Sequence, residues 1–188
     1  MSLIVILYHS QSGHTEQQAQ AVARGIDRVQ GAQARLMKVD QVEERAQELD
    51  DADAIIFGSP TFMGSLSAEM KRIFEWSSGR WAKGLWRNKI AAGFSNSGAQ
   101  AGDKLHCLMS MLLFAMQHGM IWVGMELLPG NNNSKGSMDD LNRLGVWLGA
   151  AAQSNIDQGP EIVPPPSDLQ TAEHLGTRVA EITNIFKR

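Results

Sequence analysis

A short apolar run that ends in a polar, glycine-containing loop opens this chain and limits its possible folds more than any other feature. Residues 3–7 read LIVIL, a pattern typical of a buried strand. The loop 10–15 (SQSGHT) follows closely, and a periodic segment predicted to be helical begins near Thr15. A strand, a tight loop and a helix N-terminus therefore meet at one place, as in the first unit of an α/β domain.

This first loop has the composition of a site for a terminal phosphate. The first amides of a helix have no partner inside the helix, and the helix dipole places partial positive charge there. Ser10, Ser12 and Thr15 add hydroxyl groups, and Gly13 lets the backbone approach a ligand closely. The loop matches neither a Walker loop nor a Gly-x-Gly-x-x-Gly turn. We therefore predict a phosphate monoester here; the alternative is an ordinary turn with Thr15 as helix cap.

The rest of the chain alternates apolar runs with helical patterns. Strands are expected near 2–8, 34–39, 54–57, 89–94 and 120–123, and helices near 15–30, 43–49, 67–76, 103–117 and from 167 onward. Right-handed βαβ units imply a parallel sheet covered on both faces. We predict one α/β domain over residues 1–188, with five parallel strands in the order 2-1-3-4-5. Residues 138–152 are expected to form another helix or an excursion over the sheet.

Composition excludes several classes of function. A net charge of −3 without basic clusters argues against nucleic acid as a partner. A single cysteine, Cys107, excludes an internal disulfide framework and predicts a reducing, cytoplasmic location. Residues 105–128 have the length of a membrane span, but Gln-His-Gly at 117–119 interrupts them, so no span is predicted. No metal-ligand spacing and no Ser/His/Asp set stands out.

Two further loops are expected at the same edge of the sheet as the first. In open parallel sheets a ligand lies beyond the carboxyl ends of the strands, where the strand order reverses. The loop 58–64 carries an apolar pair, Phe62 and Met63, which favours a flat ligand; the alternative is that Phe62 packs into the core. The loop 95–98 (SNSG) offers donors and acceptors for a sugar-like chain or a ring edge.

Several of these stretches resemble one family. Residues 10–15 resemble the FMN-phosphate loop of flavodoxins, and residues 58–64 (GSPTFMG) resemble the flavin-ring loop of the WrbA-like NAD(P)H:quinone oxidoreductases. The stretches 78–84, 94–98 and 117–120 are also similar to that family, in the same order along the chain. The resemblance covers roughly residues 3–123. It implies a three-layer flavodoxin-like fold with noncovalently bound FMN.

The resemblance also implies roles for individual residues. Three sets would bind the flavin: Ser10, Gln11, Ser12, Gly13, His14 and Thr15 at the phosphate; Pro60, Thr61, Phe62, Met63 and Gly64 at the isoalloxazine; Ser95, Asn96, Ser97 and Gly98 at the ribityl chain or ring edge. His118 would be catalytic, polarising a bound quinone, and Trp81 would close the site from a neighbouring subunit of a homodimer or homotetramer. From the residues alone, His118 can instead cap the preceding helix, and Trp81 can belong to a core or an interface.

The function implied is an FMN-dependent NAD(P)H:quinone oxidoreductase. A hydride would pass from NAD(P)H to FMN and then, as two electrons, to a quinone or similar acceptor. One alternative is a one-electron carrier of the flavodoxin type, although such carriers dock through a strongly acidic face that a charge of −3 does not supply. The other is a flavin-binding regulatory protein with little turnover.

Overall fold

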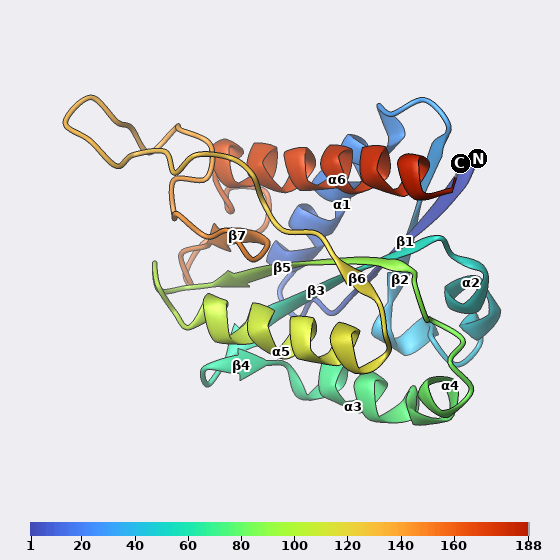
Figure 1. Cartoon of the computed structure of the whole chain (residues 1–188). Coiled ribbons are helices and arrows are strands. Elements are labelled where there is room, and N and C mark those ends of the chain that lie inside the picture. The colour runs from blue at the N-terminus through green and yellow to red at the C-terminus, as the bar shows by residue number, and fades with distance from the viewer. Residues whose placement is uncertain (188) are drawn as a thin grey trace.

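A parallel sheet with the strand order β2-β1-β3-β5-β6 forms the centre of the molecule in the computed structural model, which describes residues 1–187 (Figure 1). The strands are β1 (Ser2–Tyr8), β2 (Ala32–Lys38), β3 (Ala54–Phe62), β4 (Ser65–Leu66), β5 (Ile90–Ser97), β6 (Ile121–Trp122) and β7 (Ala150–Gln153). The helices are α1 (His14–Asp27), α2 (Ala46–Asp51), α3 (Ala68–Trp76), α4 (Ser78–Ala82), α5 (Lys104–Gln117) and α6 (Pro166–Phe186), with a 3₁₀ turn at Val39–Gln41. The predicted flavodoxin-like α/β class is confirmed.

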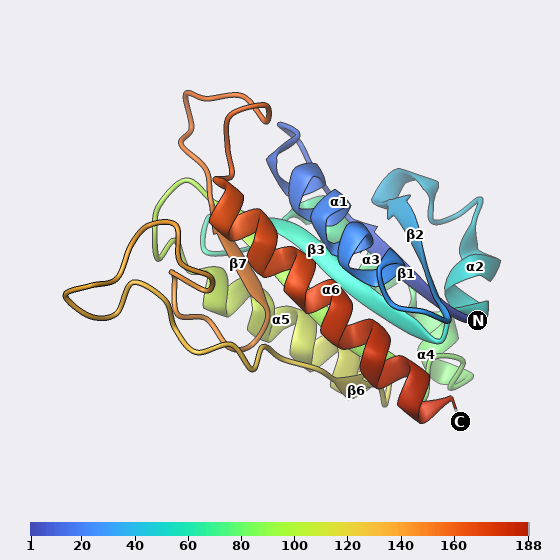
Figure 2. The ribbon, with the colours of Figure 1, turned by 90° about the horizontal axis from the view of Figure 1, so that it is seen from above.

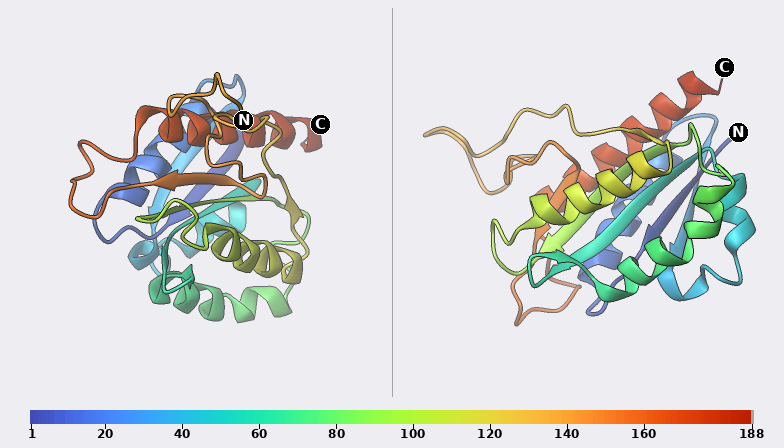
Figure 3. Two further views of the ribbon diagram at one scale, coloured as in Figure 1. Left: turned by 90° about the vertical axis from the view of Figure 1, so that its left-hand side faces the viewer. Right: turned by 60° about the horizontal axis from the view of Figure 1, so that its bottom comes forward.

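Two apolar cores lie on opposite faces of the sheet. Alternate residues of a strand point to opposite faces, so Ile4 and Ile6 pack with α1 and α6, while Val5 and Leu7 pack with α2, α3 and α5. All four side chains are fully buried. Figure 3 shows the resulting three layers, with α6 and α1 on one side of the sheet and α5 and α3 on the other. Burial on both faces explains why the central strands read as continuous apolar runs.

Helices α1 and α6 lie side by side over one face of the sheet (Figure 2). Two glycines allow their close approach: a Cβ at Gly25 would overlap the carbonyl of Glu173, and a Cβ at Gly176 would overlap the carbonyl of Val22. Any side chain at either position would push the helices apart. The C-terminal helix is therefore fixed against the helix that follows the first loop.

The fifth position of the sheet is divided between two strands. β6 pairs with residues 90–91 of β5, and β7 pairs with residues 94–97 of the same strand. Residues 123–149 leave the sheet between them and form a long protruding excursion (Figures 1 and 3). The excursion predicted for 138–152 is present; no helix forms there, and residues 150–153 return to the sheet as β7. Residues 128–133 (LPGNNN) are rich in turn formers and do not continue a strand.

Two other segments differ from their predictions. β3 extends to Phe62 and turns back into β4, so the loop 58–64 is mostly strand and hairpin. Met63 and Gly64 have φ values of 48° and 80°, as a tight hairpin turn between right-twisted strands requires. The helix expected over 43–49 is present as the short α2, which begins three residues later, and a 3₁₀ turn precedes it. No helix within residues 1–187 combines the length and the apolar character that crossing a bilayer requires.

Candidate functional site

A cavity of about 450 Å³ lies where the carboxyl ends of β1, β3 and β5 meet. It brings together thirteen of the fifteen predicted flavin-binding residues: Ser10, Gln11, Ser12, His14, Thr15, Pro60, Thr61, Phe62, Met63, Gly64, Asn96, Ser97 and Gly98. Gly13 and Ser95 are not in its lining. The three loops are far apart in the sequence but adjacent in space, because parallel strands end at the same edge of the sheet.

One end of the cavity is formed by the N-terminus of α1. The amides of Gly13, His14 and Thr15 have no hydrogen-bond partner among residues 1–187. The amide of Glu16 donates to Ser10 Oγ at 3.1 Å, which leaves the Ser10 hydroxyl proton free to donate to a ligand. The helix begins at His14 with Gly13 as its cap, so Thr15 lies inside the first turn and is not the helix cap. None of the lining residues within 1–187 is Lys or Arg.

Pro160 packs closely against Gly13, on the turn that carries the free amides. Its φ of 85° lies in the left-handed region, and a Cβ there would come within 2.8 Å of Pro160 Cγ. The segment that carries Pro160 also holds His14, whose Nε2–H donates to the carbonyl of Gln158 at 2.8 Å. The turn that presents the free amides is therefore fixed by residues far along the chain.

A fourth segment, which the sequence analysis missed, completes the wall. Ser154 and Ile156 follow β7 and line the cavity, and Ala99 and Gly102 extend the third loop. A signal for Ser154 exists in the sequence: the short apolar run 150–152 ends in polar residues, like the strands that precede the other loops. The run is only three alanines, too short to indicate a strand by itself.

The other end of the cavity carries the hairpin tip between β3 and β4. Met63 is fully exposed and Phe62 is 43% exposed, so Phe62 does not pack into the core. The carbonyl of Gly64 accepts a 2.6 Å hydrogen bond from His106 Nδ1 on α5, which holds the tip in place. An exposed apolar tip fixed beside a cavity is suited to a flat, largely apolar ring.

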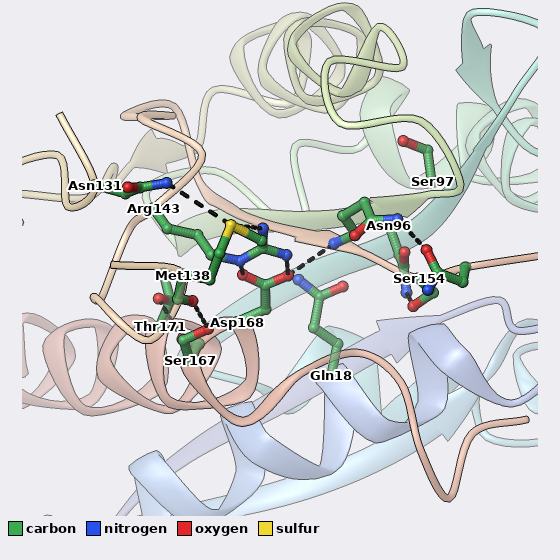
Figure 4. A network of polar contacts seen from close by, with 12 residues as sticks. Gln18, Asn96, Ser97, Asn131, Met138, Arg143, Ser154, Ser167, Asp168 and Thr171 are labelled. Carbon is green, nitrogen blue, oxygen red and sulfur yellow. Dashed lines mark hydrogen bonds and ion pairs between the residues drawn. The ribbon is translucent and has the colours of Figure 1, made fainter. Parts of the chain in front are cut away.

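The third loop contributes Ser95 to the framework that joins the loops, and Asn96, Ser97 and Gly98 to the cavity wall. Ser95 is fully buried, and its hydroxyl lies 2.9 Å from the Ser59 carbonyl and 2.7 Å from Thr61 Oγ1, which joins the second and third loops. Asn96 faces the cavity, where its Nδ2 donates to Ser154 Oγ at 2.9 Å (Figure 4). Its Oδ1 is buried and has no hydrogen-bond partner among residues 1–187.

Comparisons with known proteins agree with this geometry. A family model described as NADPH-dependent FMN reductase matches residues 27–132, more than half of the chain. The chain belongs to this family. A protein called Flavodoxin FldP, from Pseudomonas aeruginosa, is 40% identical, and an NAD(P)H dehydrogenase (quinone) of Archaeoglobus fulgidus is 34% identical, each over 97% of both chains. The structure of a flavodoxin, WrbA-like protein from Agrobacterium tumefaciens superposes with a TM-score of 0.75 at 35% identity, over 98% of this chain and 99% of the other.

The cavity of this FMN reductase family member fits FMN at both ends. Free helix-terminal amides suit a doubly charged phosphate without any basic side chain. The unpaired Oδ1 of Asn96 is an acceptor that a ribityl hydroxyl would satisfy, which matters because a buried acceptor without a partner costs about 1–3 kcal/mol. The apolar tip at Phe62 and Met63 is available to the isoalloxazine ring.

His118 and Trp81 lie outside this cavity. His118 follows the C-terminal end of α5, roughly 20 Å along the helix from the cavity end, given about 1.5 Å per residue. Its Nε2–H donates to Ser77 Oγ at 2.9 Å, and its ring stacks on Trp86 at 4.5 Å. Burial lowers the pKa of His118 to about 4, so the ring is neutral at pH 7. Its side chain bonds to Ser77 and not to the carbonyls that end α5.

His118 and Trp81 instead share a second hollow of about 790 Å³ between α3, α4 and α5. Trp81 is half exposed at its rim, and Leu113 is 66% exposed beside it. A single copy of this family member therefore does not bring these two residues to its own FMN cavity. Any contact of either residue with the flavin requires a second copy of the chain.

Proposed function

We propose that this chain is an FMN-dependent oxidoreductase that passes a hydride from NAD(P)H to FMN and two electrons on to a quinone or similar acceptor. One observation carries the proposal: a single cavity joins unpaired helix-terminal amides to an exposed apolar hairpin tip. The names of two relatives support it, since the proteins of A. fulgidus and of Aromatoleum aromaticum, 34% and 29% identical to this chain, are each called NAD(P)H dehydrogenase (quinone).

Each part of the cavity has its own task in this proposal. FMN, when bound, supplies the acceptance and release of the hydride. The amides from Gly13 to Thr15 hold its phosphate, and Asn96 Oδ1 accepts from a ribityl hydroxyl. The tip at Phe62 and Met63 orients the ring and limits water on one side of it. No side chain is required as a nucleophile.

We also propose that the chain assembles as a homodimer or homotetramer in the cytoplasm. The half-exposed Trp81 and the exposed Leu113 at the second hollow are apolar groups that a second copy would cover. A catalytic role for His118 depends on such an assembly. It also depends on the tautomer, because the ring nitrogen without a partner, Nδ1, is an acceptor in the present arrangement and a quinone oxygen needs a donor. Ser77 would then donate to Nε2.

The test first measures FMN binding and then NAD(P)H oxidation. Purified chain is mixed with FMN, freed of excess cofactor and examined by visible absorption, and NADH and NADPH oxidation is then followed with benzoquinone as acceptor. Bound flavin with rapid NAD(P)H oxidation is the expected result. A colourless chain without affinity for FMN would end the proposal. Unchanged kcat/KM in His118→Ala would remove His118 from the reaction while leaving the proposal intact.

A second candidate function is one-electron transfer between protein partners. The name of the P. aeruginosa relative, Flavodoxin FldP, supports it. Reductive titration separates the two functions. A carrier accumulates the one-electron reduced flavin and reacts negligibly with NAD(P)H, whereas the proposed reductase passes directly to the two-electron reduced form.

A further inference from the structure

A lysine is buried directly behind the wall of the flavin cavity. Lys104 begins α5, and its side chain is only 1% exposed. Its ammonium donates to Ser97 Oγ at 2.6 Å and to the carbonyl of Ala99 at 2.8 Å. Ser97 and Ala99 both line the cavity, whereas Lys104 itself does not. One layer of third-loop atoms therefore separates a buried ammonium from the cavity.

This ammonium lacks the counter-ion that a buried charge normally has. No carboxylate among residues 1–187 forms an ion pair with Lys104. The charges of Asp168 and Arg143 both act on Lys104. The Asp168 carboxylate is engaged by Arg143, with Oδ1 2.8 Å from Nε and Oδ2 2.7 Å from Nη2. Burial lowers the pKa of Lys104 to about 8, which keeps most of it charged at pH 7. Lys104, Arg143 and Asp168 together form a buried group of two cations and one anion, which keeps one unbalanced positive charge beside the cavity.

We propose that Lys104 is a positioning residue that sets the electron affinity of the flavin, because its buried ammonium stabilises the negative charge that the ring acquires on reduction. The inference rests on the FMN site proposed above. A hydride brings two electrons and one proton, so its transfer to N5 adds one negative charge to the ring while NAD(P)H leaves as NAD(P)⁺. A fixed cation in a poorly solvated wall stabilises that charge far more than a surface lysine could.

The decisive measurement is the two-electron reduction potential of bound FMN, obtained by equilibration with a reference dye. Lys104→Met removes the charge and both hydrogen bonds, whereas Lys104→Gln removes the charge and keeps donors for Ser97 and Ala99. We expect both variants to shift the reduction equilibrium at least tenfold toward oxidised FMN, which is about 30 mV for a two-electron couple. Their FMN-free forms should unfold at the same or a higher temperature than the parent, because an unpaired buried charge is removed.

Lys89→Met is the matched control. Lys89 precedes β5 at the opposite end of the strand, and its ammonium also donates to backbone carbonyls, those of Asp50 and Ala52. Its loss should leave the potential within twofold of the parent equilibrium. A potential within twofold of the parent equilibrium in both Lys104 variants would overturn the inference. A shift in Lys104→Met with none in Lys104→Gln would overturn it too, because hydrogen bonding and not charge would then set the potential. If the parent chain binds no FMN, the proposed function fails and this inference fails with it.

Discussion

The ion pair between Arg143 and Asp168 should be the most sensitive point in the fold outside the two apolar cores. Arg143 lies in the excursion between β6 and β7, and Asp168 lies in the first turn of α6 (Figure 4). Their side chains are only 1% and 2% exposed. Asp168 Oδ2 also accepts from the amide of Gln153 at 2.8 Å, which attaches the end of β7 to the same group. One carboxylate therefore joins three segments.

The expected cost of breaking this pair follows from its burial. Removing one partner of a fully buried pair leaves the other charge without compensation, at about 3–5 kcal/mol. For a chain of this size, about 2–4 °C of melting temperature is lost per kcal/mol, so the expected drop is roughly 6–20 °C. Asp168→Asn should cost more than Arg143→Met, because it leaves Arg143 and Lys104 as two buried cations without an anion.

Urea unfolding of the FMN-free chain, followed by circular dichroism, would measure these costs without the contribution of the cofactor. Combining Arg143→Met with Asp168→Asn should reduce the free energy of unfolding by clearly less than the sum of the two single changes, since neither position then leaves its former partner as an uncompensated buried charge. Glu43→Gln is the control: its pair with Arg72 has a similar distance, 3.1 Å, but both side chains are exposed, so less than about 1 kcal/mol should be lost. Single changes at the buried pair that cost as little as this control would refute the reasoning.

Three further predictions concern the cavity and the second hollow. Gly13→Ala should lower the free energy of unfolding by about 1–2 kcal/mol because Gly13 has a positive φ. The clash with Pro160 should also weaken FMN binding more than tenfold in a fluorescence titration. Unchanged binding would contradict the assigned turn. Asn96→Ala should weaken FMN about tenfold, the equivalent of one hydrogen bond of about 1–1.5 kcal/mol, and equal affinity would exclude the ribityl contact. Burial lowers the pKa of His118 in the folded chain to about 4, below its ordinary value of 6.5. Between these two values the unfolded chain binds a proton that the folded chain does not. The free energy of unfolding should therefore fall as the pH is lowered from 6.5 to 4. In His118→Gln that decline should be reduced in pH-dependent urea unfolding; a parent curve that is flat over this range would refute the burial argument.

The first loop and the central strands could be predicted from the sequence because their signals are local. A buried parallel strand is apolar on both faces, and a helix N-terminus leaves amides free whatever surrounds it, so residues 3–15 indicate both structure and ligand class. The alternation of strands and helices indicated a parallel sheet, and the phosphate-type loop after the first strand suggested the order of its five main strands, whereas β4 and β7 were not predicted. The path of residues 123–149 could not be predicted from the sequence. Turn-rich segments have no hydrophobic period, so nothing local indicates that the chain rejoins the sheet at residue 150.

The sequence by itself determined the fold class and the three loops that meet at one edge, because backbone periodicity and strand direction depend on neighbouring residues. Only the tertiary structure decided which distant side chains complete the wall, such as Ser154, and that Ser95 faces inward. It also placed His118 in the second hollow, outside the FMN cavity, and Lys104 behind the third loop. Burial and charge compensation decide these positions, and both depend on contacts between segments that no local pattern records.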